Sequence, residues 1–228
     1  MEQEKIWEYY QNEAIESFEG SKGRLSYLLK NIKPNSKVLN IGVGGGIFEI
    51  MAIKEGIDIY SLDPDKSAIT NLRDRLNIDE NKAKVGYSQE IPFPDNTFDY
   101  VVMSEVIEHL TDEIISDSLK EVKRVLKEDG NFIGTVPSRE DLKAQEVICP
   151  CCANKFHRWG HVQSFTPVSL DKLLSKTFTV EKIIEKSFIT WESLNYKGKT
   201  VAMIKSILSN LGIHGSGENI YFCVKKTS

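Results

Sequence analysis

The chain has 228 residues, of which 40% are hydrophobic and 27% are charged, and its formal net charge is −4 at pH 7. This composition is ordinary for a globular domain with a hydrophobic core, and the acidic balance argues against a nucleic-acid substrate. Since no apolar run approaches the ~20 residues of a membrane-spanning helix and the N-terminus lacks a signal-peptide core, we expect a cytoplasmic protein without a membrane span.

Strands and helices alternate along most of the chain, after an N-terminal section (residues 4–32) that carries two helical stripes. The expected elements are strand 37–42, helix 46–55, strand 57–62, helix 65–76, strand 83–87, strand 98–104, helix 112–126, strand 131–136, helix 167–175, strand 178–187, helix 199–211 and strand 219–225. Alternating strand and helix units build a doubly wound, mostly parallel α/β sheet, which binds ligands at the carboxyl ends of its strands.

The predicted domain organisation is a single domain over residues 1–228 with three additions to the alternating pattern. These additions are an N-terminal helical cap at 1–35, an insertion at 138–166 and a helical insertion at 189–217, before the last strand. The insertion at 138–166 lacks clear periodicity, and structureless connections of this length are uncommon unless they have a function.

A glycine-rich turn connects the first predicted strand to its helix, in the segment VLNIGVGGGIFEI at residues 38–50. A dinucleotide fingerprint of the GxGxxG type would need glycine at position 47, which is occupied by Ile47. The pattern present is GxGxG, formed by Gly42, Gly44 and Gly46. A glycine turn of this kind allows the backbone to approach a nucleotide cofactor closely.

Asp63 follows the second predicted strand, in the segment YSLDPD. A carboxylate at this place can accept hydrogen bonds from both ribose hydroxyls of a nucleoside. The alternative role is that of a helix N-cap, because Pro64 follows where a helix is expected to start. The two roles are compatible with each other.

Residues 85–110 read VGYSQEIPFPDNTFDYVVMSEVIEHL. With the GxGxG turn and Asp63, this segment resembles the class I S-adenosylmethionine (SAM) dependent methyltransferases, and IPFPDNTFD matches their small-molecule branch, often called type 11. The resemblance covers residues 36–136 well and the remainder loosely. It implies a seven-stranded, mostly parallel Rossmann-like sheet with helices on both faces, an antiparallel last strand, and SAM as the cofactor.

The resemblance implies cofactor-binding roles for Asn40, Gly42, Gly44, Gly46, Asp63, Ser88, Gln89 and Ser104. Two of the family's acidic residues are replaced in this chain. Asn40 can orient the glycine turn by hydrogen bonding, but it adds no negative charge near the sulfonium. Tyr87 stands where the family carries an acid for the adenine, so we expect that contact to come from the backbone of Ser88 and Gln89.

His109, in the segment SEVIEHL, is the candidate catalytic base, because the resemblance places this end of the fourth strand opposite the transferred methyl group. A structural role in packing is the alternative. Methyl transfer from a sulfonium is a displacement on an activated carbon, and proximity with exclusion of water can accelerate it without a base.

Three of the four cysteines lie in the segment CPCCANKFHRWGH at residues 149–161. Cys149 and Cys152 form a CxxC pair and His157 and His161 form an HxxxH pair, which are ligand types and spacings of a closed tetrahedral zinc site. Some bacterial and archaeal type 11 methyltransferases carry a similar CPxCGxxFHxxGH segment. We predict a structural zinc ion on these four residues that orders the insertion; the alternatives are an oxidisable thiol pair or histidines that line the substrate pocket.

The leading functional prediction is a SAM-dependent methyltransferase whose small-molecule acceptor enters beneath the zinc loop and helix 199–211. One alternative is an RNA or DNA methyltransferase that uses the zinc loop for contact, which the acidic charge and the absence of an NPPY-like segment disfavour. Another is a non-catalytic SAM-binding protein, because fold does not fix function.

Helix 199–211 carries one apolar side, formed by Val201, Ile204, Ile207, Leu208 and Leu211. We expect this side to pack into the core, and a homodimer seam or a lid over an apolar acceptor are the alternatives.

Overall fold

A seven-stranded sheet forms the centre of the computed structural model, which describes residues 2–190, 195–210 and 218–226. Its strand order is β3-β2-β1-β4-β5-β9-β8, and β9 runs antiparallel to both of its neighbours while the other pairs are parallel. The strands are β1 (Lys37–Ile41), β2 (Asp58–Asp63), β3 (Ala83–Val85), β4 (Phe98–Ser104), β5 (Leu126–Pro137), β8 (Phe178–Lys186) and β9 (Asn219–Lys226). The doubly wound sheet and its antiparallel strand near the C-terminus are therefore confirmed.

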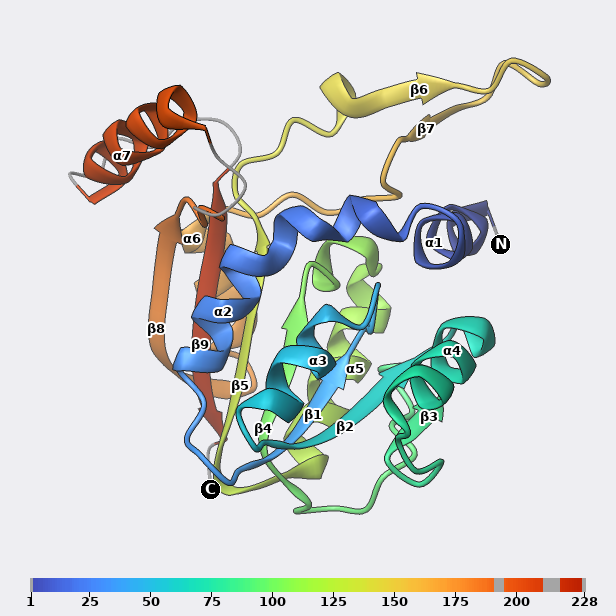
Figure 1. Ribbon diagram of the computed structural model, residues 1–228, viewed down its shortest axis with the longest axis vertical. Helices are drawn as coiled ribbons and strands as arrows, with labels where there is room; N and C mark the ends of the chain where they lie inside the picture. The colour runs from blue at the N-terminus through green and yellow to red at the C-terminus, as the bar shows by residue number, and fades with distance from the viewer. Residues whose placement is uncertain (1, 191–194, 211–217, 227–228) are drawn as a thin grey trace.

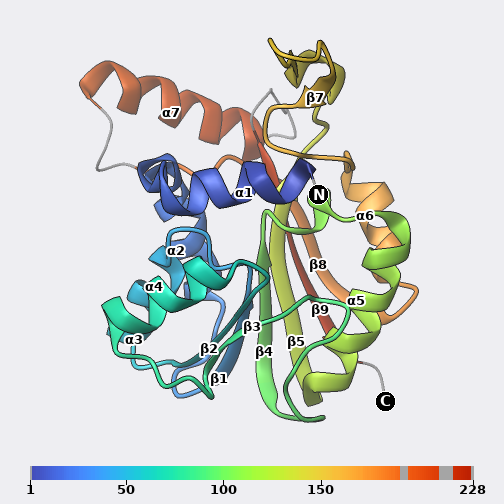
Figure 2. The same cartoon turned by 90° about the vertical axis from the view of Figure 1, so that its right-hand side faces the viewer.

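Helices cover both faces of the sheet, as Figure 2 shows: α2, α3 and α4 lie on one side, and α5 and α6 lie on the other. The α-helices are α1 (Glu2–Asn12), α2 (Lys22–Lys30), α3 (Ile47–Lys54), α4 (Lys66–Leu76), α5 (Asp112–Val125), α6 (Pro167–Leu174) and α7 (Tyr196–Asn210). Short 3-10 helices occur at η1 (Ile15–Ser21), η2 (Ile107–His109) and η3 (Lys143–Gln145). This three-layer arrangement gives each face of the sheet its own hydrophobic core.

The central strands are buried on both faces, which explains their nearly continuous apolar sequences. In β1, the residues from Val38 to Ile41 are all buried. In β4, residues 100–103 (YVVM) are buried as well. Strands of this kind are typical of parallel sheets covered by helices on both sides.

Two strand boundaries differ from the sequence prediction by two residues or more, for reasons of strand pairing. β5 begins at Leu126, five residues earlier than predicted, because Leu126 already pairs with Phe98 before an irregularity in the register. β3 ends at Val85 and not at 87, because its partner strand β2 offers Asp63 as the last paired residue.

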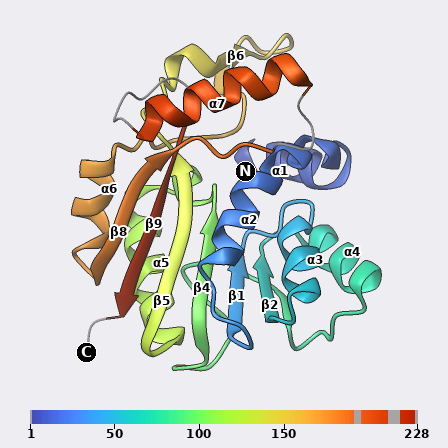
Figure 3. The same ribbon diagram turned by 60° about the vertical axis from the view of Figure 1, so that its left-hand side comes forward.

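The insertion at 138–166 contains a two-stranded antiparallel hairpin of β6 (Glu146–Ile148) and β7 (Lys155–His157), which the lack of periodicity had not predicted. Three residues a strand are too few to show an alternating pattern in the sequence. Figures 1 and 3 show that the hairpin, α1 and α7 all lie beyond the same edge of the sheet, the edge where the parallel strands end.

On the predicted apolar side of α7, the side chains of Val201 and Ile207 are 55% and 53% exposed, so these two do not pack into the core as predicted. Ala202, on the same helix, is buried. The side chains of Ile204 and Leu208, and the whole of Leu211, lie outside the part of the chain that the structure describes. None of the helices in the described ranges combines the length and the apolar character that crossing a membrane would require.

Candidate active site

A cavity of about 630 Å³ lies at the carboxyl ends of β1, β2 and β4, where the sheet topology predicts a ligand. Its walls include the predicted cofactor residues Asn40, Gly42, Gly44, Asp63, Ser88, Gln89 and Ser104, together with His109. Gly46 lies just outside this wall, at the start of α3. The structure therefore gathers residues from four separate strand ends around a volume of the size that small ligands and cofactors occupy.

The glycine turn depends on backbone conformations that other residues adopt rarely. Gly42, Gly44 and Gly46 have φ angles of 88°, 49° and 72°. A Cβ atom on Gly42 would lie 2.6 Å from the side chain of Val106, and one on Gly44 would lie 3.0 Å from the ring of Phe18. The turn therefore needs glycine both for its conformation and for the close approach of neighbouring side chains.

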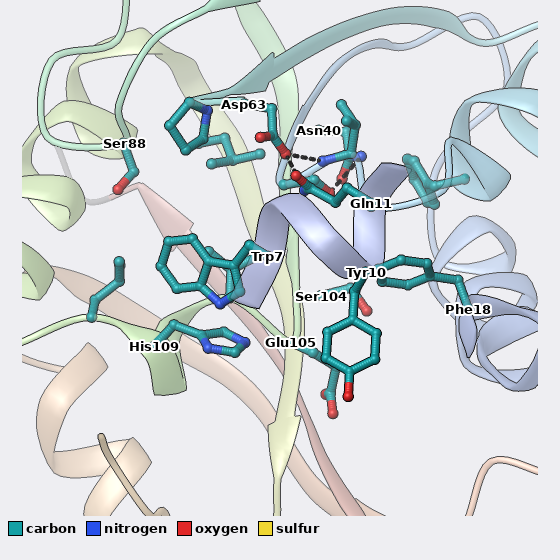
Figure 4. Close-up of a pocket in the computed structure, with 18 of the residues that line it drawn as sticks. Trp7, Tyr10, Gln11, Phe18, Asn40, Asp63, Ser88, Ser104, Glu105 and His109 are labelled. Carbon is teal, nitrogen blue, oxygen red and sulfur yellow. Dashed lines mark hydrogen bonds between the residues drawn. The ribbon is translucent and has the colours of Figure 1, made fainter. Parts of the chain in front are cut away.

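Asp63 lies at the end of β2 with its carboxylate directed at the glycine turn and at α1. Its oxygens accept hydrogen bonds from Val43 N (2.9 Å), Asp65 N (2.9 Å) and Gln11 Nε2 (3.0 Å). The helix N-cap is Asp65, whose side chain accepts from Ser67 N and Ala68 N, so the predicted alternative role of Asp63 belongs to its neighbour. Figure 4 shows Gln11 reaching from α1 to Asp63 across the cavity.

Asn40 is joined to a buried acid that the sequence analysis missed. Asn40 Nδ2 donates to Gly42 O (3.3 Å) and to Glu49 Oε1 (2.8 Å), which also accepts from Ser61 Oγ (2.9 Å). Glu49 is fully buried, and burial raises its pKa. The signal in the sequence was a charged residue next to Phe48 on the buried face of α3.

The segment after β3 lines the cavity with residues 86–89. The Ser88 hydroxyl is hydrogen-bonded to the Ser118 hydroxyl of α5 at 2.6 Å, so it is directed into the protein. The Tyr87 side chain is 51% exposed. Ser88 and Gln89 both line the cavity.

The carboxyl end of β4 forms a polar network with the N-terminal helices. Ser104 Oγ accepts from Arg24 Nε at 3.0 Å and lies 3.0 Å from Thr135 Oγ1. Glu105 has a φ of 57°, accepts from Asn219 Nδ2 at 2.8 Å and lies 3.8 Å from Arg24 Nη1. Among the described residues other than glycine with a positive φ, Glu105 is the one that lines the cavity.

His109 is held in an aromatic and imidazole environment. Its Nδ1 lies 3.3 Å from Gly160 O, and its ring contacts those of Trp7 and His161 at centroid distances of 5.1 and 4.6 Å. Burial, with the neighbouring His161, lowers the pKa of His109 to about 3. A histidine with this pKa is neutral at physiological pH and is a weak proton acceptor, so its environment does not favour the predicted role of catalytic base.

Comparison with known proteins decides the family. Residues 7–179 match the family model described as a methyltransferase domain. The chain belongs to this family. With the SAM-type glycine turn at the ligand-binding edge of the confirmed fold, it is a SAM-dependent methyltransferase.

Relatives support the same assignment over part of the chain. YrhH of Bacillus subtilis (strain 168), named as a methyltransferase, is 31% identical over 123 residues, which are 52% of this chain and 67% of YrhH. The uncharacterized methyltransferase C1B3.06c of Schizosaccharomyces pombe is 30% identical over 117 residues, 46% of this chain and 41% of that protein. The chain thus spans less than half the length of this second relative.

Among solved structures, a chain in the complex between the Haloferax volcanii Trm112 methyltransferase activator and a methyltransferase is similar, with a TM-score of 0.69 and 15% identity. The match covers 98% of each chain. At this identity the likeness shows that this chain and the matched chain share a fold.

The predicted zinc ligands of the methyltransferase are not gathered into one site. Cys149 N donates to Asn154 O at 2.8 Å across the turn of the β6–β7 hairpin, whereas His157 pairs with Glu146 at the hairpin's other end. At ~3.3 Å per residue, the start of the turn and His157 are roughly 10 Å apart. In the described ranges, the groups of three ligand side chains within 4.8 Å combine His161 with Glu140 and His157, or with Glu108 and His109, and none contains a cysteine.

The hairpin explains why the four residues separate. Its strands stay paired up to His157, so Cys149 and Cys152 lie at the outer turn while His161 and Glu140 line the cavity. Ala153 takes a left-handed φ of 58° in this turn, where similar segments carry glycine. The prediction of zinc on the CxxC and HxxxH pairs therefore does not fit the arrangement of these side chains.

Asp63 should make the stability of the methyltransferase depend on pH. Burial raises the pKa of Asp63 to about 6, above its ordinary value, so the folded state binds the proton more tightly than the unfolded state. The resulting stabilisation is fully present below the unfolded pKa and is lost as pH rises through about 6. Urea unfolding measures the free energy of unfolding at about pH 5 and about pH 7.5. Between these two pH values, we expect the wild type to lose about 1 kcal/mol more than the Asp63→Asn variant loses. An equal loss in the variant and the wild type would contradict the assignment.

Proposed function

We propose that this methyltransferase transfers a methyl group from SAM to a small-molecule acceptor that binds between α1 and the carboxyl ends of β4 and β5. The observation that carries the proposal is the continuity of the cavity. It extends from the glycine turn and Asp63 to His109 and Glu140, and its volume of about 630 Å³ is in the range of small-molecule sites. An acceptor at the His109 end would lie next to the predicted cofactor residues.

The residues at the cofactor end suit an adenosyl group with a positive sulfur. Bound SAM supplies an activated methyl carbon for in-line displacement. The glycine turn leaves room for close backbone approach, and the carboxylate of Asp63 can accept from ribose hydroxyls in place of Gln11 Nε2. Ser88 and Gln89 line the same cavity, and their backbone groups would contact the adenine.

The residues at the acceptor end suit exclusion of water and orientation of a small molecule. Trp7 and Tyr10 of α1 line the cavity, and the Tyr10 ring contacts the Trp159 ring at 4.9 Å. Trp7 Nε1 and Gln11 Oε1 are buried and have no hydrogen-bond partner in the described part of the chain. Polar atoms of this kind favour a ligand that supplies the missing partners. Proximity and a dry site can then accelerate the transfer without a dedicated base.

The acceptor class can be tested by finding which fraction of a cell extract receives the labelled methyl group. The full chain is incubated with SAM labelled in the methyl group and with a cell extract separated into metabolite, nucleic-acid and protein fractions. We expect label in the metabolite fraction. Label confined to RNA or DNA would support the nucleic-acid alternative, and SAM binding without label in any fraction would support the non-catalytic alternative.

Trp7→Ala should separate acceptor binding from cofactor binding. Removing the indole opens the acceptor end to water, so we expect turnover with the metabolite fraction to fall about 10- to 100-fold, with SAM affinity within about threefold. The matched control is Tyr9→Ala on the same helix, where the side chain is 50% exposed. Equal effects of the two changes would contradict the placement of the acceptor.

A further inference from the structure

The strongest unexplained feature beyond the cofactor site is a buried carboxyl group beside two histidines. Glu108 is fully buried, and neither of its carboxyl oxygens has a hydrogen-bond partner among the described residues. One of these oxygens, a ring nitrogen of His109 and a ring nitrogen of His161 lie within 4.8 Å of one another. Burial of an unpaired carboxyl group is unfavourable, and native proteins compensate it with a partner.

We propose that Glu108, His109 and His161 bind a divalent transition-metal ion in the wall of the cavity, with Zn²⁺ as the best fit. Two imidazoles and one carboxylate form the ligand set of open zinc sites and of facial triads. This site differs from the predicted zinc site, because it shares only His161 with it and uses no cysteine.

One ring nitrogen of each histidine lies beside a hydrogen-bond acceptor, an arrangement that favours metal binding through the other ring nitrogen. His161 Nδ1 lies 2.5 Å from Glu140 Oε2, and His109 Nδ1 lies 3.3 Å from Gly160 O. Both partners are acceptors, so Nδ1 carries the proton in each ring and Nε2 carries the lone pair. Histidine ligands of metals characteristically donate their second N–H to a carboxylate or a backbone carbonyl.

The same reasoning excludes His157 as a ligand in this arrangement. His157 Nδ1 accepts from Trp159 N (3.3 Å) and His161 N (3.1 Å), so the neutral ring carries its proton on Nε2. Nε2 is buried, lies 3.5 Å from Glu140 Oε1 and has no hydrogen-bond partner among the described residues. Glu140 contacts His161 Nδ1 and so orients the His161 ring, whereas the neutral His157 ring offers no lone pair to an ion from Nε2.

Backbone hydrogen bonds fix the two halves of the proposed site against each other. Val162 N and Gln163 N both donate to Glu108 O, at 2.9 and 3.0 Å. The segment that carries His161 is thereby fastened to η2, which carries Glu108 and His109. Such preorganisation lets a site bind metal with little rearrangement.

The proposed ion would have an open coordination position on the cavity side, because His109 and His161 line the cavity. Three protein ligands leave one position of a tetrahedral ion for an exogenous ligand. An oxygen, nitrogen or sulfur atom of the methyl acceptor could occupy it, which would restrict the acceptor class to molecules with a metal-binding heteroatom. This role rests on the proposed function, whereas the metal site itself does not.

Metal analysis of the full chain, purified without chelators and then loaded with cobalt(II), tests the site independently of activity. We expect one ion per chain, and a cobalt spectrum without thiolate charge-transfer bands in the near ultraviolet. Glu108→Gln, His109→Asn and His161→Asn should each lower the metal affinity about tenfold or more. The matched control, Cys149→Ser with Cys152→Ser, should leave the metal content unchanged.

Three outcomes would overturn the proposal: no bound cobalt, thiolate bands in the spectrum, or loss of metal in the cysteine variant with retention in the His109 variant. SAM calorimetry on every variant shows whether it is folded. Since the wild-type cobalt spectrum needs no variant, the proposal remains testable if a substitution prevents folding. Failure of SAM binding in the wild type would contradict the proposed function and leave the metal result standing.

Discussion

Asp63→Asn should weaken SAM binding about a hundredfold, because the charged acceptor for the ribose hydroxyls is lost. Hydrogen bonds to a charged group contribute about 1.5–3 kcal/mol each, so the loss of charge at two such contacts gives an effect of this order. The amide keeps the size of the side chain and one acceptor oxygen. Isothermal titration calorimetry with SAM measures the dissociation constant directly.

The matched control for this change is Asp58→Asn, at the other end of β2. Asp58 forms an exposed ion pair with Lys82 at 2.7 Å and does not line the cavity. Exposed pairs of this kind contribute about 0–1 kcal/mol to stability, so we expect SAM affinity within about twofold of wild type. Equal affinities for SAM in the two variants would show that Asp63 does not hold the ribose.

Gly134→Ala should be the most destabilising single substitution that we predict, although it adds one methyl group. Gly134 lies in β5 between Met103 of β4 and Phe222 of β9. A Cβ atom there would be 2.0 Å from Met103 O and 2.5 Å from the Phe222 ring. Because the first contact is with backbone, we expect a loss of about 3 kcal/mol and a decrease in Tm of roughly 6–12 °C.

Gly20→Ala is the control for the general effect of replacing glycine. A Cβ atom on Gly20 would have no neighbour within 4 Å. Since the change also reduces the entropy of the unfolded chain, we expect stability within about 1 kcal/mol of wild type. Thermal unfolding of both variants checks the pair, and a Gly134→Ala protein as stable as Gly20→Ala would contradict the packing of β5 described above.

The sheet and the glycine turn were predictable because their signals are local. The apolar strand β1, the three glycines after it and the acid at the end of β2 lie within one strand–helix–strand unit. Their spacing determines where they meet in space, since parallel strands end at the same edge. The same reasoning placed Ser88 and Ser104 at this edge, and both line the cavity.

The acceptor end was not predictable in the same way, because it depends on contacts between distant segments. Arg24 and Ser104 are separated by 80 residues, and Glu105 and Asn219 by 114. Glu49 was missed because it lies on the helix after the glycine turn, and its hydrogen bond with Asn40 forms only in the folded chain.

The cysteine and histidine segment shows a further limit of spacing. The positions suited four zinc ligands, but strand pairing in the hairpin leaves Cys149 and Cys152 at its outer turn, while His161 lines the cavity. Ligand spacing indicates which residues can reach a common ion; the backbone between them decides whether they do.

Calorimetric titration of the wild-type chain with SAM, its demethylated product and a nicotinamide dinucleotide tests the central claim most directly. If the turn of Gly42, Gly44 and Gly46 receives an adenosyl sulfonium, SAM and its product should each bind at one site per chain, and the dinucleotide should give no heat of binding. Binding of the dinucleotide, or no binding of SAM, would contradict the account.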